Sequence, residues 1–144
     1  MKNVTTIEQV KEILVEEFGV KVDVCDKDIL IVEDNGVVVQ ICLTEEEVPR
    51  LRFKINLFSI DDSTPENLNS IFLDLNTEID PIAIGIDTTD PKDIKFQILT
   101  TLRVGSLQSE EVIMAFNGLM GTEPVLVEVI KNNKQALNIK ELKS

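Results

Sequence analysis

Hydrophobic residues recur along this chain with two different periods, and the change of period separates helices from strands. The first period is helical, and its apolar face is made of Ile7, Val10, Leu14 and Phe18. Capping boxes that start at Thr5 and Thr6 precede this face, and Gly19 follows it, as glycine commonly does at the end of a helix. The pattern therefore predicts an opening helix that ends before Gly19.

After Gly19 the apolar and polar residues alternate, which is typical of strands with one buried face. Strands are predicted over residues 20–25, 29–32, 37–43, 50–60, 82–87 and 94–104. Asn35-Gly36 separates the second strand from the third, and this dipeptide readily adopts the positive φ angles of a type I′ turn. We therefore expect the first three strands to form a meander.

Two further helices are predicted from helical stripes of apolar residues. The earlier helix begins at Thr64-Pro65, and its stripe consists of Leu68, Ile71, Phe72, Leu75 and Ile79. The later helix is capped by Ser106, and its stripe consists of Val112, Ile113, Phe116 and Met120. Gly118 and Gly121 are expected to break this helix, and a separate helical stretch is expected from Thr122 to Ile130.

These elements predict an α+β fold with an antiparallel sheet, in the order α-β-β-β-β-α-β-β-α, and with helices packed on the sheet. Residues 1–130 are expected to form a single domain. Residues 131–144 carry four Lys and one Glu, and we expect them to be a frayed basic extension. The expected core contains Phe53, Ile55, Phe72, Leu75, Phe96 and Ile98.

Charge and composition exclude several classes of function. The chain has no histidine and a formal net charge of −12, so sites that depend on histidine are excluded and nucleic-acid binding is disfavoured. No apolar run is long enough for a membrane span, and the acidic start does not resemble a signal peptide, so we expect a cytoplasmic protein. Cys25 and Cys42 fall on the first and third strands, about 9.6 Å apart in a meander, and are expected to be free thiols.

No motif in the sequence predicts a catalytic, cofactor-binding or metal-binding residue, and we expect no cofactor. Arg50, Arg52 and Lys54 share one face of the strand at 50–60. In so acidic a chain their expected partners are its own carboxylates on neighbouring strands, and the alternative is an acidic ligand.

Some apolar residues fall on the polar face of their element, and these are the candidate interface residues. They are Val38, Phe58, Leu73 and Leu99. Scattered exposed apolar residues need no function, but a set that the fold brings together indicates an interface.

The order of elements resembles the type III secretion chaperone-like fold, a group that includes the YbjN-like proteins. The resemblance covers roughly residues 5–130 and is clearest from Leu68 to Gly85, around Ile71-Phe72-Leu73-Asp74-Leu75-Asn76. The entry Gly19-Val20-x-Val22-x-Val24 fits as well. The long strand at 50–60, the absence of Trp and the basic extension depart from the secretion chaperones and favour the YbjN-like branch.

This resemblance implies a cytoplasmic homodimer that binds polypeptide without catalysis, so the leading hypothesis is a chaperone- or adaptor-like protein-binding module. Such a module would bind a partner of unknown identity through its exposed sheet surface or its strand edges. The alternative is an enzyme or small-ligand-binding protein that uses carboxylates near the Arg50, Arg52 and Lys54 strand face.

Overall fold

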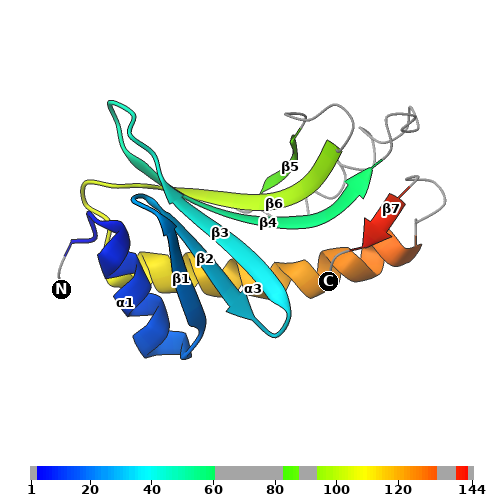
Figure 1. The fold of residues 1–144 in the computed structure, drawn as a ribbon, viewed down its shortest axis with the longest axis horizontal. Coiled ribbons are helices and arrows are strands. Elements are labelled where there is room, and N and C mark those ends of the chain that lie inside the picture. Colours follow the sequence, from blue (N-terminus) through cyan, green and yellow to red (C-terminus); the bar gives the residue numbers. More distant parts are fainter. Residues whose placement is uncertain (1–2, 61–82, 88–93, 133–138, 143–144) are drawn as a thin grey trace. The chain divides into compact units, whose positions relative to one another are not determined.

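The computed structural model describes residues 3–60, 83–87, 94–132 and 139–142 (Figure 1). In these ranges lie α1 (Ile7–Phe18), β1 (Lys21–Asp26), β2 (Ile29–Asp34), β3 (Val37–Leu43), β4 (Arg50–Ile60), β5 (Ala83–Asp87), β6 (Ile94–Arg103), α3 (Ser109–Asn132) and β7 (Ile139–Leu142). The predicted α+β class is confirmed. The helix expected over 64–79 and the loop expected over 88–93 lie outside the described residues.

The strands are hydrogen-bonded in the order β1-β2-β3-β4-β6-β5, and β7 pairs with β4 beside this path. The chain divides into two compact units, which we call unit 1 and unit 2. Unit 1 comprises Met1–Ile55 and Thr100–Gly118, and unit 2 comprises Asn56–Leu99 and Leu119–Ser144. Because β4, β6 and α3 contribute residues to both units, the single domain expected over residues 1–130 stays a prediction.

Helix α1 begins and ends where the sequence predicts. The Thr6 hydroxyl accepts a hydrogen bond from the Gln9 backbone N–H, and the Gln9 side chain accepts one from the Thr6 backbone N–H. Gly19 caps the other end with φ 62°, and its N–H donates to the Val15 carbonyl. The helix lies against β1 and β2, and its apolar stripe is buried there (Figure 1).

The β2–β3 hairpin sets the register of the sheet in unit 1. Asn35 and Gly36 both have positive φ angles, 53° and 82°, as a type I′ turn requires. The register that follows places Val32 opposite Val39 and Leu30 opposite Ile41, and all four side chains are fully buried. Because β4 continues this alternation, one face of the sheet forms the core.

Four of the six residues expected in the core are described, and all four are buried. Phe53 and Ile55 lie in unit 1, and Phe96 and Ile98 lie in unit 2. In unit 1 the ring of Phe18 also contacts that of Phe116, with centroids 4.8 Å apart. The other two expected core residues, Phe72 and Leu75, lie outside the described residues.

The strand expected over residues 20–25 is present, but the prediction that one of its faces is buried is wrong for its second half. Val20 is buried, but Val24 is 51% exposed, because β1 is an end strand of the sheet with no strand beyond it among those described. A β-bulge also leaves Cys25 without a register partner, between the pairs Val24–Leu30 and Asp26–Ile29. The free thiols expected at Cys25 and Cys42 are confirmed, since β2 lies between their strands.

Two predictions for the last helix are wrong. It begins at Ser109 rather than after a Ser106 cap, and it continues to Asn132 without a break at Gly118 or Gly121. Its apolar side continues past both glycines: Leu119, between them, is buried, and so are Leu126 and Val127 beyond them. We infer that this burial offsets the cost of Gly, about 1 kcal/mol each, and of Pro124, about 3 kcal/mol, in a helix interior.

The last described segment is β7, which pairs with β4. Leu142 of β7 lies opposite Phe58, and Glu141 lies opposite Ser59. This strand lies within residues 131–144, where the sequence predicts a frayed extension. No helix in the described ranges is both long enough and apolar enough to cross a membrane.

We expect two glycine substitutions to change stability in opposite directions. A Cβ at Gly121 meets nothing within 4 Å and the residue is helical, so Gly121→Ala should raise the free energy of unfolding by about 0.5–1 kcal/mol. Gly19 also has space, but its φ of 62° strains any residue with a Cβ, so Gly19→Ala should lower that free energy by about 1 kcal/mol. Urea unfolding measures both, and a loss of stability in Gly121→Ala would contradict the continuous helix.

Candidate functional site

The face of the unit 1 sheet opposite the core is the most accessible candidate site, and we call it the outer face. The register aligns its side chains in rows across the strands. One row runs Asp23, Ile31, Gln40, Lys54, and the next contains Ile29, Cys42 and Arg52. The apolar members of both rows are half-buried and exposed enough for contact. The outer face thus combines an apolar centre with charged borders.

The four candidate interface residues have different positions. Val38 is on the outer face opposite Glu33, and it is 51% exposed. Leu99 is half-buried in β6 of unit 2, opposite Ala83, and Phe58 belongs to β4 of unit 2, opposite Leu142. Leu73 lies outside the described residues. Within the described ranges, therefore, Val38 is the member of the set that clearly presents an exposed apolar side chain.

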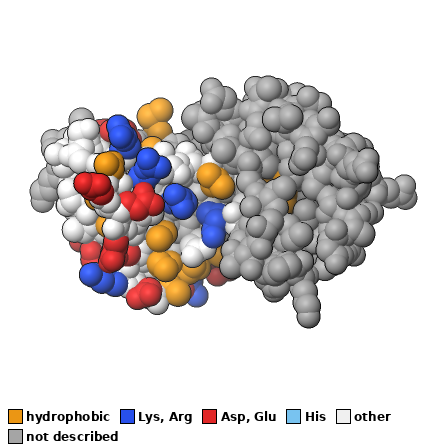
Figure 2. Space-filling model, turned by 90° about the horizontal axis from the view of Figure 1, so that it is seen from above, with side chains coloured by type: hydrophobic (Ala, Val, Ile, Leu, Met, Phe, Trp, Pro, Cys, Tyr) orange, Lys and Arg blue, Asp and Glu red, His pale blue; other side chains and the backbone are white. Residues whose placement is uncertain are grey.

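The basic residues of β4 do not have the partners expected from the sequence. Arg52 lies opposite Cys42 and Lys54 opposite Gln40, so the neighbouring strand offers no carboxylate at either position. The expectation of carboxylate partners on adjacent strands is therefore wrong for this pair of strands. Figure 2 shows a face on which described Lys and Arg side chains follow a diagonal, with hydrophobic and acidic side chains beside it.

Arg103 belongs with these cations, although the sequence analysis did not group it with them. The Val104 N–H donates to the Pro49 carbonyl at 3.1 Å, so the end of β6 lies beside the start of β4. The sequence indicates which face of its strand Arg103 occupies, but only the pairing of β4 with β6 brings it to Arg50.

A well-buried polar contact lies in unit 2, between Gln97 and Asn56. The Gln97 side chain is 5% exposed, and its Nε2 donates to Asn56 Oδ1 at 2.6 Å. A buried amide needs such a partner, because an unsatisfied donor loses its hydrogen bonds to water without replacement. This pair links β6 to β4 and contributes to structure rather than to chemistry.

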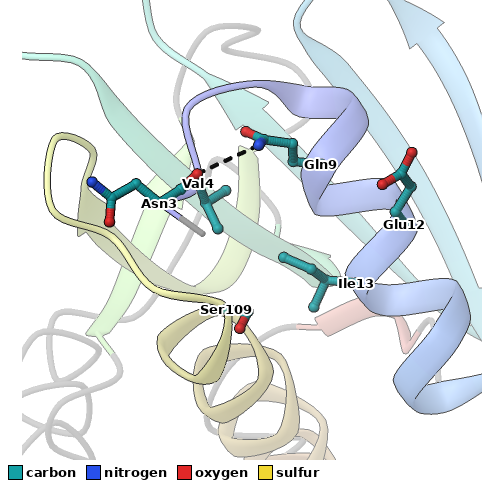
Figure 3. A pocket seen from close by; sticks show the side chains of 6 residues that line it. All are labelled: Asn3, Val4, Gln9, Glu12, Ile13 and Ser109. Atoms are coloured by element: carbon teal, nitrogen blue, oxygen red, sulfur yellow. Dashed lines mark hydrogen bonds between the residues drawn. The ribbon is translucent and has the colours of Figure 1, made fainter. Parts of the chain in front are cut away.

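A small pocket in unit 1 is a weaker candidate (Figure 3). Asn3 and Val4 line it with Gln9, Glu12, Ile13 and Ser109, and its volume is about 150 Å³. Ligand sites usually measure about 300–1,000 Å³. Two of its polar groups are also engaged internally, since Asn3 Oδ1 accepts from Gln108 Nε2 and Gln9 Oε1 accepts from the Thr5 N–H. The pocket therefore offers little to a ligand.

The described residues contain no group of three or more Cys, Asp or Glu side chains placed to hold a metal ion. The carboxylates near Arg50, Arg52 and Lys54 that an enzyme hypothesis needs are not supplied by the register of β3. In the described part of the chain, the outer face is therefore a better candidate binding site than the small pocket.

Comparison with known proteins identifies the fold. No family model matches the chain, and no curated protein matches it. Solved structures do match, among them the crystal structure of YbjN from E. coli, described as "a putative transcription regulator". The TM-score is 0.62 at 15% sequence identity, over 97% of this chain and 100% of that chain. The fold is therefore YbjN-like, and at this identity the likeness concerns the fold alone.

We expect Asn56→Ala to lower the free energy of unfolding by about 1–3 kcal/mol, because it leaves the buried Gln97 amide without its acceptor. Gln40→Ala removes another amide-bearing strand residue from a half-buried site and should change stability by no more than about 0.5 kcal/mol. Denaturant unfolding of both variants tests the contact. Equal losses would show that the Asn56–Gln97 hydrogen bond contributes nothing specific.

Proposed function

We propose that this chain is a non-catalytic protein-binding module of the chaperone- or adaptor-like kind, which acts as a cytoplasmic homodimer. The observation that carries the proposal is the open outer face, where Ile29, Ile31 and Cys42 form an accessible apolar centre. An extended polypeptide that lies along such a face gains apolar contacts at alternate residues. The YbjN-like fold and the resemblance to the secretion chaperones agree with this role.

The outer face suits a partner better than the edge of the sheet does. Every residue of β1 except Val22 is exposed, but the strand carries the charges of Lys21, Asp23 and Asp26. The bulge at Cys25 interrupts its ladder of hydrogen bonds. Charges and bulges are the devices by which edge strands avoid pairing with other chains. We therefore place the partner on the outer face rather than at the β1 edge.

A non-catalytic role also agrees with the absence of histidine from the sequence. The charge of −12 also agrees with this leading hypothesis, because like charge keeps molecules with an exposed apolar face apart in solution.

Binding of an unfolded polypeptide tests this function directly. Permanently reduced and alkylated α-lactalbumin is the probe, and we expect it to shift backbone amide signals of β2 and β3 in NMR spectra. Ile31→Lys places a charge in the apolar centre and should weaken binding at least about tenfold. Val15→Lys is the control, because Val15 is 43% exposed on α1, away from the outer face. Shifts confined to α1, or no binding at all, would overturn the proposal.

The homodimer is a separate prediction, for which we propose Val38, Phe58, Leu73 and Leu99 as interface residues. Val38→Asp should convert the dimer into a monomer, since an interface cannot accommodate an unpaired charge at low cost. Val24→Asp is a matched control, because Val24 is also 51% exposed but shares the face of Leu30. Light scattering on a sizing column distinguishes the two masses. A monomeric parent protein, or a dimeric Val38→Asp, would contradict this interface.

A further inference from the structure

Cations lie directly opposite one another where β4 and β6 meet in unit 1. The Val104 N–H donates to the Pro49 carbonyl, and the Gln97 side chain donates to Asn56. From the first contact to the second, β4 advances seven residues while β6 goes back seven, so the two strands run antiparallel. The next pair along the strands is Arg50 with Arg103. Residues opposite each other share one face of a sheet, and both arginines are exposed.

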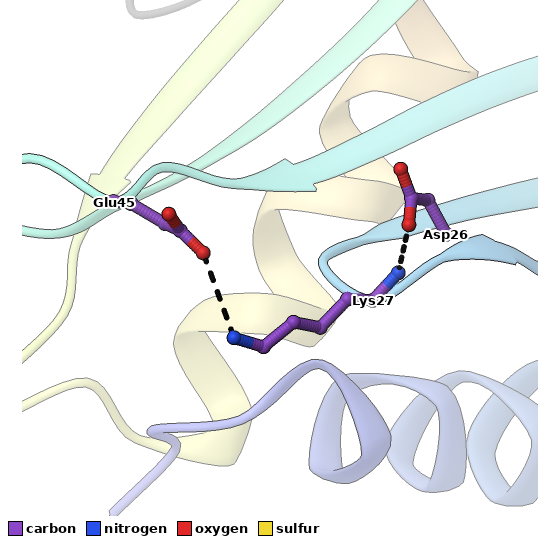
Figure 4. A network of polar contacts seen from close by, with 3 residues as sticks. All are labelled: Asp26, Lys27 and Glu45. Atoms are coloured by element: carbon purple, nitrogen blue, oxygen red, sulfur yellow. Dashed lines mark hydrogen bonds and ion pairs between the residues drawn. The ribbon is translucent and has the colours of Figure 1, made fainter.

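With Arg52 and Lys54, which follow Arg50 on the same face, these residues form what we call the basic cluster. None of its four members has an ion pair among the described residues, where the observed pair is between Lys27 and Glu45. Lys27 Nζ lies 3.7 Å from Glu45 Oε1, and the Lys27 backbone N–H donates to Asp26 Oδ1 (Figure 4). Glu45 is therefore paired with the turn between β1 and β2. Glu46 and Glu47, which lie closer to β4 in the sequence, have no ion pair among the described residues.

The acid that shares a row of the outer face with the basic cluster lies far from it. Asp23 and Lys54 occupy the same row, but β2 and β3 separate their strands. Three strand spacings amount to about 14 Å, and salt screens exposed charges beyond about 8 Å at physiological ionic strength. Like charges in directly opposed strand positions destabilise a sheet. The opposed arginines therefore disfavour the fold, and the basic cluster has no ion pair within 4 Å among the described residues.

We propose that the basic cluster binds the carboxylates of an acidic, extended segment in the polypeptide partner. This inference rests on the proposed function and adds the chemistry of the partner. Arg50, Arg52 and Lys54 are spaced by two residues, about 6.8 Å along a strand. An extended peptide with acids at alternate positions has the same spacing. The guanidinium groups of Arg50 and Arg52 can bind these carboxylates in bidentate geometry.

A peptide fits the charge of the molecule better than a nucleic acid does. The net charge of −12 repels a polyanion over its whole length, whereas a short acidic segment contacts mainly the basic cluster. The apolar centre beside the cluster also has no counterpart on a phosphate backbone. We therefore commit to the acidic peptide and treat a nucleic acid as an outcome that the experiment detects.

Fluorescence anisotropy with three probes tests the inference. The probes are a fluorescein-labelled peptide in which Glu alternates with Leu, the same peptide with Gln in place of Glu, and a single-stranded oligonucleotide of equal length. We expect the Glu peptide to bind about tenfold more tightly than the Gln peptide, with an advantage that falls as sodium chloride is added. The double variant R52Q/R103Q should lose that advantage.

The matched control is Lys21→Gln, which removes one exposed cation from β1, opposite Glu33 and outside the basic cluster. It should leave the preference for the Glu peptide unchanged. Equal binding of the Glu and Gln peptides would overturn the inference while leaving polypeptide binding intact. Failure of both peptides, together with unfolded α-lactalbumin, would overturn the proposed function itself, and tighter binding of the oligonucleotide would replace the acidic peptide as ligand.

Stability gives a readout that does not depend on any ligand. If Arg103 serves binding rather than stability, Arg103→Gln should relieve the repulsion between Arg103 and Arg50. The urea unfolding midpoint of the variant should then be equal to or above that of the parent protein. A lower midpoint would show that Arg103 stabilises the fold through partners of its own, and the inference would fail.

Discussion

The register of the β2–β3 hairpin is the constraint on which the rest of unit 1 depends. Asn35 and Gly36 adopt the two positive φ angles that a two-residue turn needs, and this fixes Val32 opposite Val39. Because side chains alternate between faces, a slip by one residue would expose the apolar core positions and bury the polar ones. The composition of the outer face is therefore set by the same turn that forms the core.

The outer face and the β1 edge of the sheet carry different kinds of residues. Along β1, charges and the bulge at Cys25 make the exposed backbone a poor template for another strand. Across β2 and β3 the apolar side chains of Ile29 and Ile31 remain accessible. This contrast directs a partner to side chains on the face, where specificity comes from the pattern of apolar and charged groups rather than from backbone pairing.

The basic cluster illustrates how binding and stability oppose each other. Arg50 and Arg103 repel each other across two strands in a protein that has nearly twice as many acids as bases, 26 against 14. An acidic chain could place a carboxylate at such a position and gain stability, yet neither of the two opposed positions holds one. Binding surfaces often carry groups that are unfavourable in the free protein and satisfied by the partner.

Local signals in the sequence determined the elements. The capping box at Thr6, the end of α1 at Gly19, the turn at Asn35-Gly36 and the alternation along β4 each depend on residues a few positions apart, so they were predictable. Continuity of α3 through Gly118, Gly121 and Pro124 was not, because local propensity argues for a break and burial of Leu119 and Leu126 overrides it.

Within the candidate site, the sequence by itself determined that Arg50, Arg52 and Lys54 share a face and that Val38 departs from the polar phase of its strand. Only the tertiary structure decided which residues oppose them: Cys42 and Gln40 on β3, and Arg103 at the end of β6. It also decided that Val24 is exposed, because β1 has no described neighbour beyond it. The physical reason is that strand alternation is a local property of the backbone, whereas strand pairing joins residues far apart in the chain.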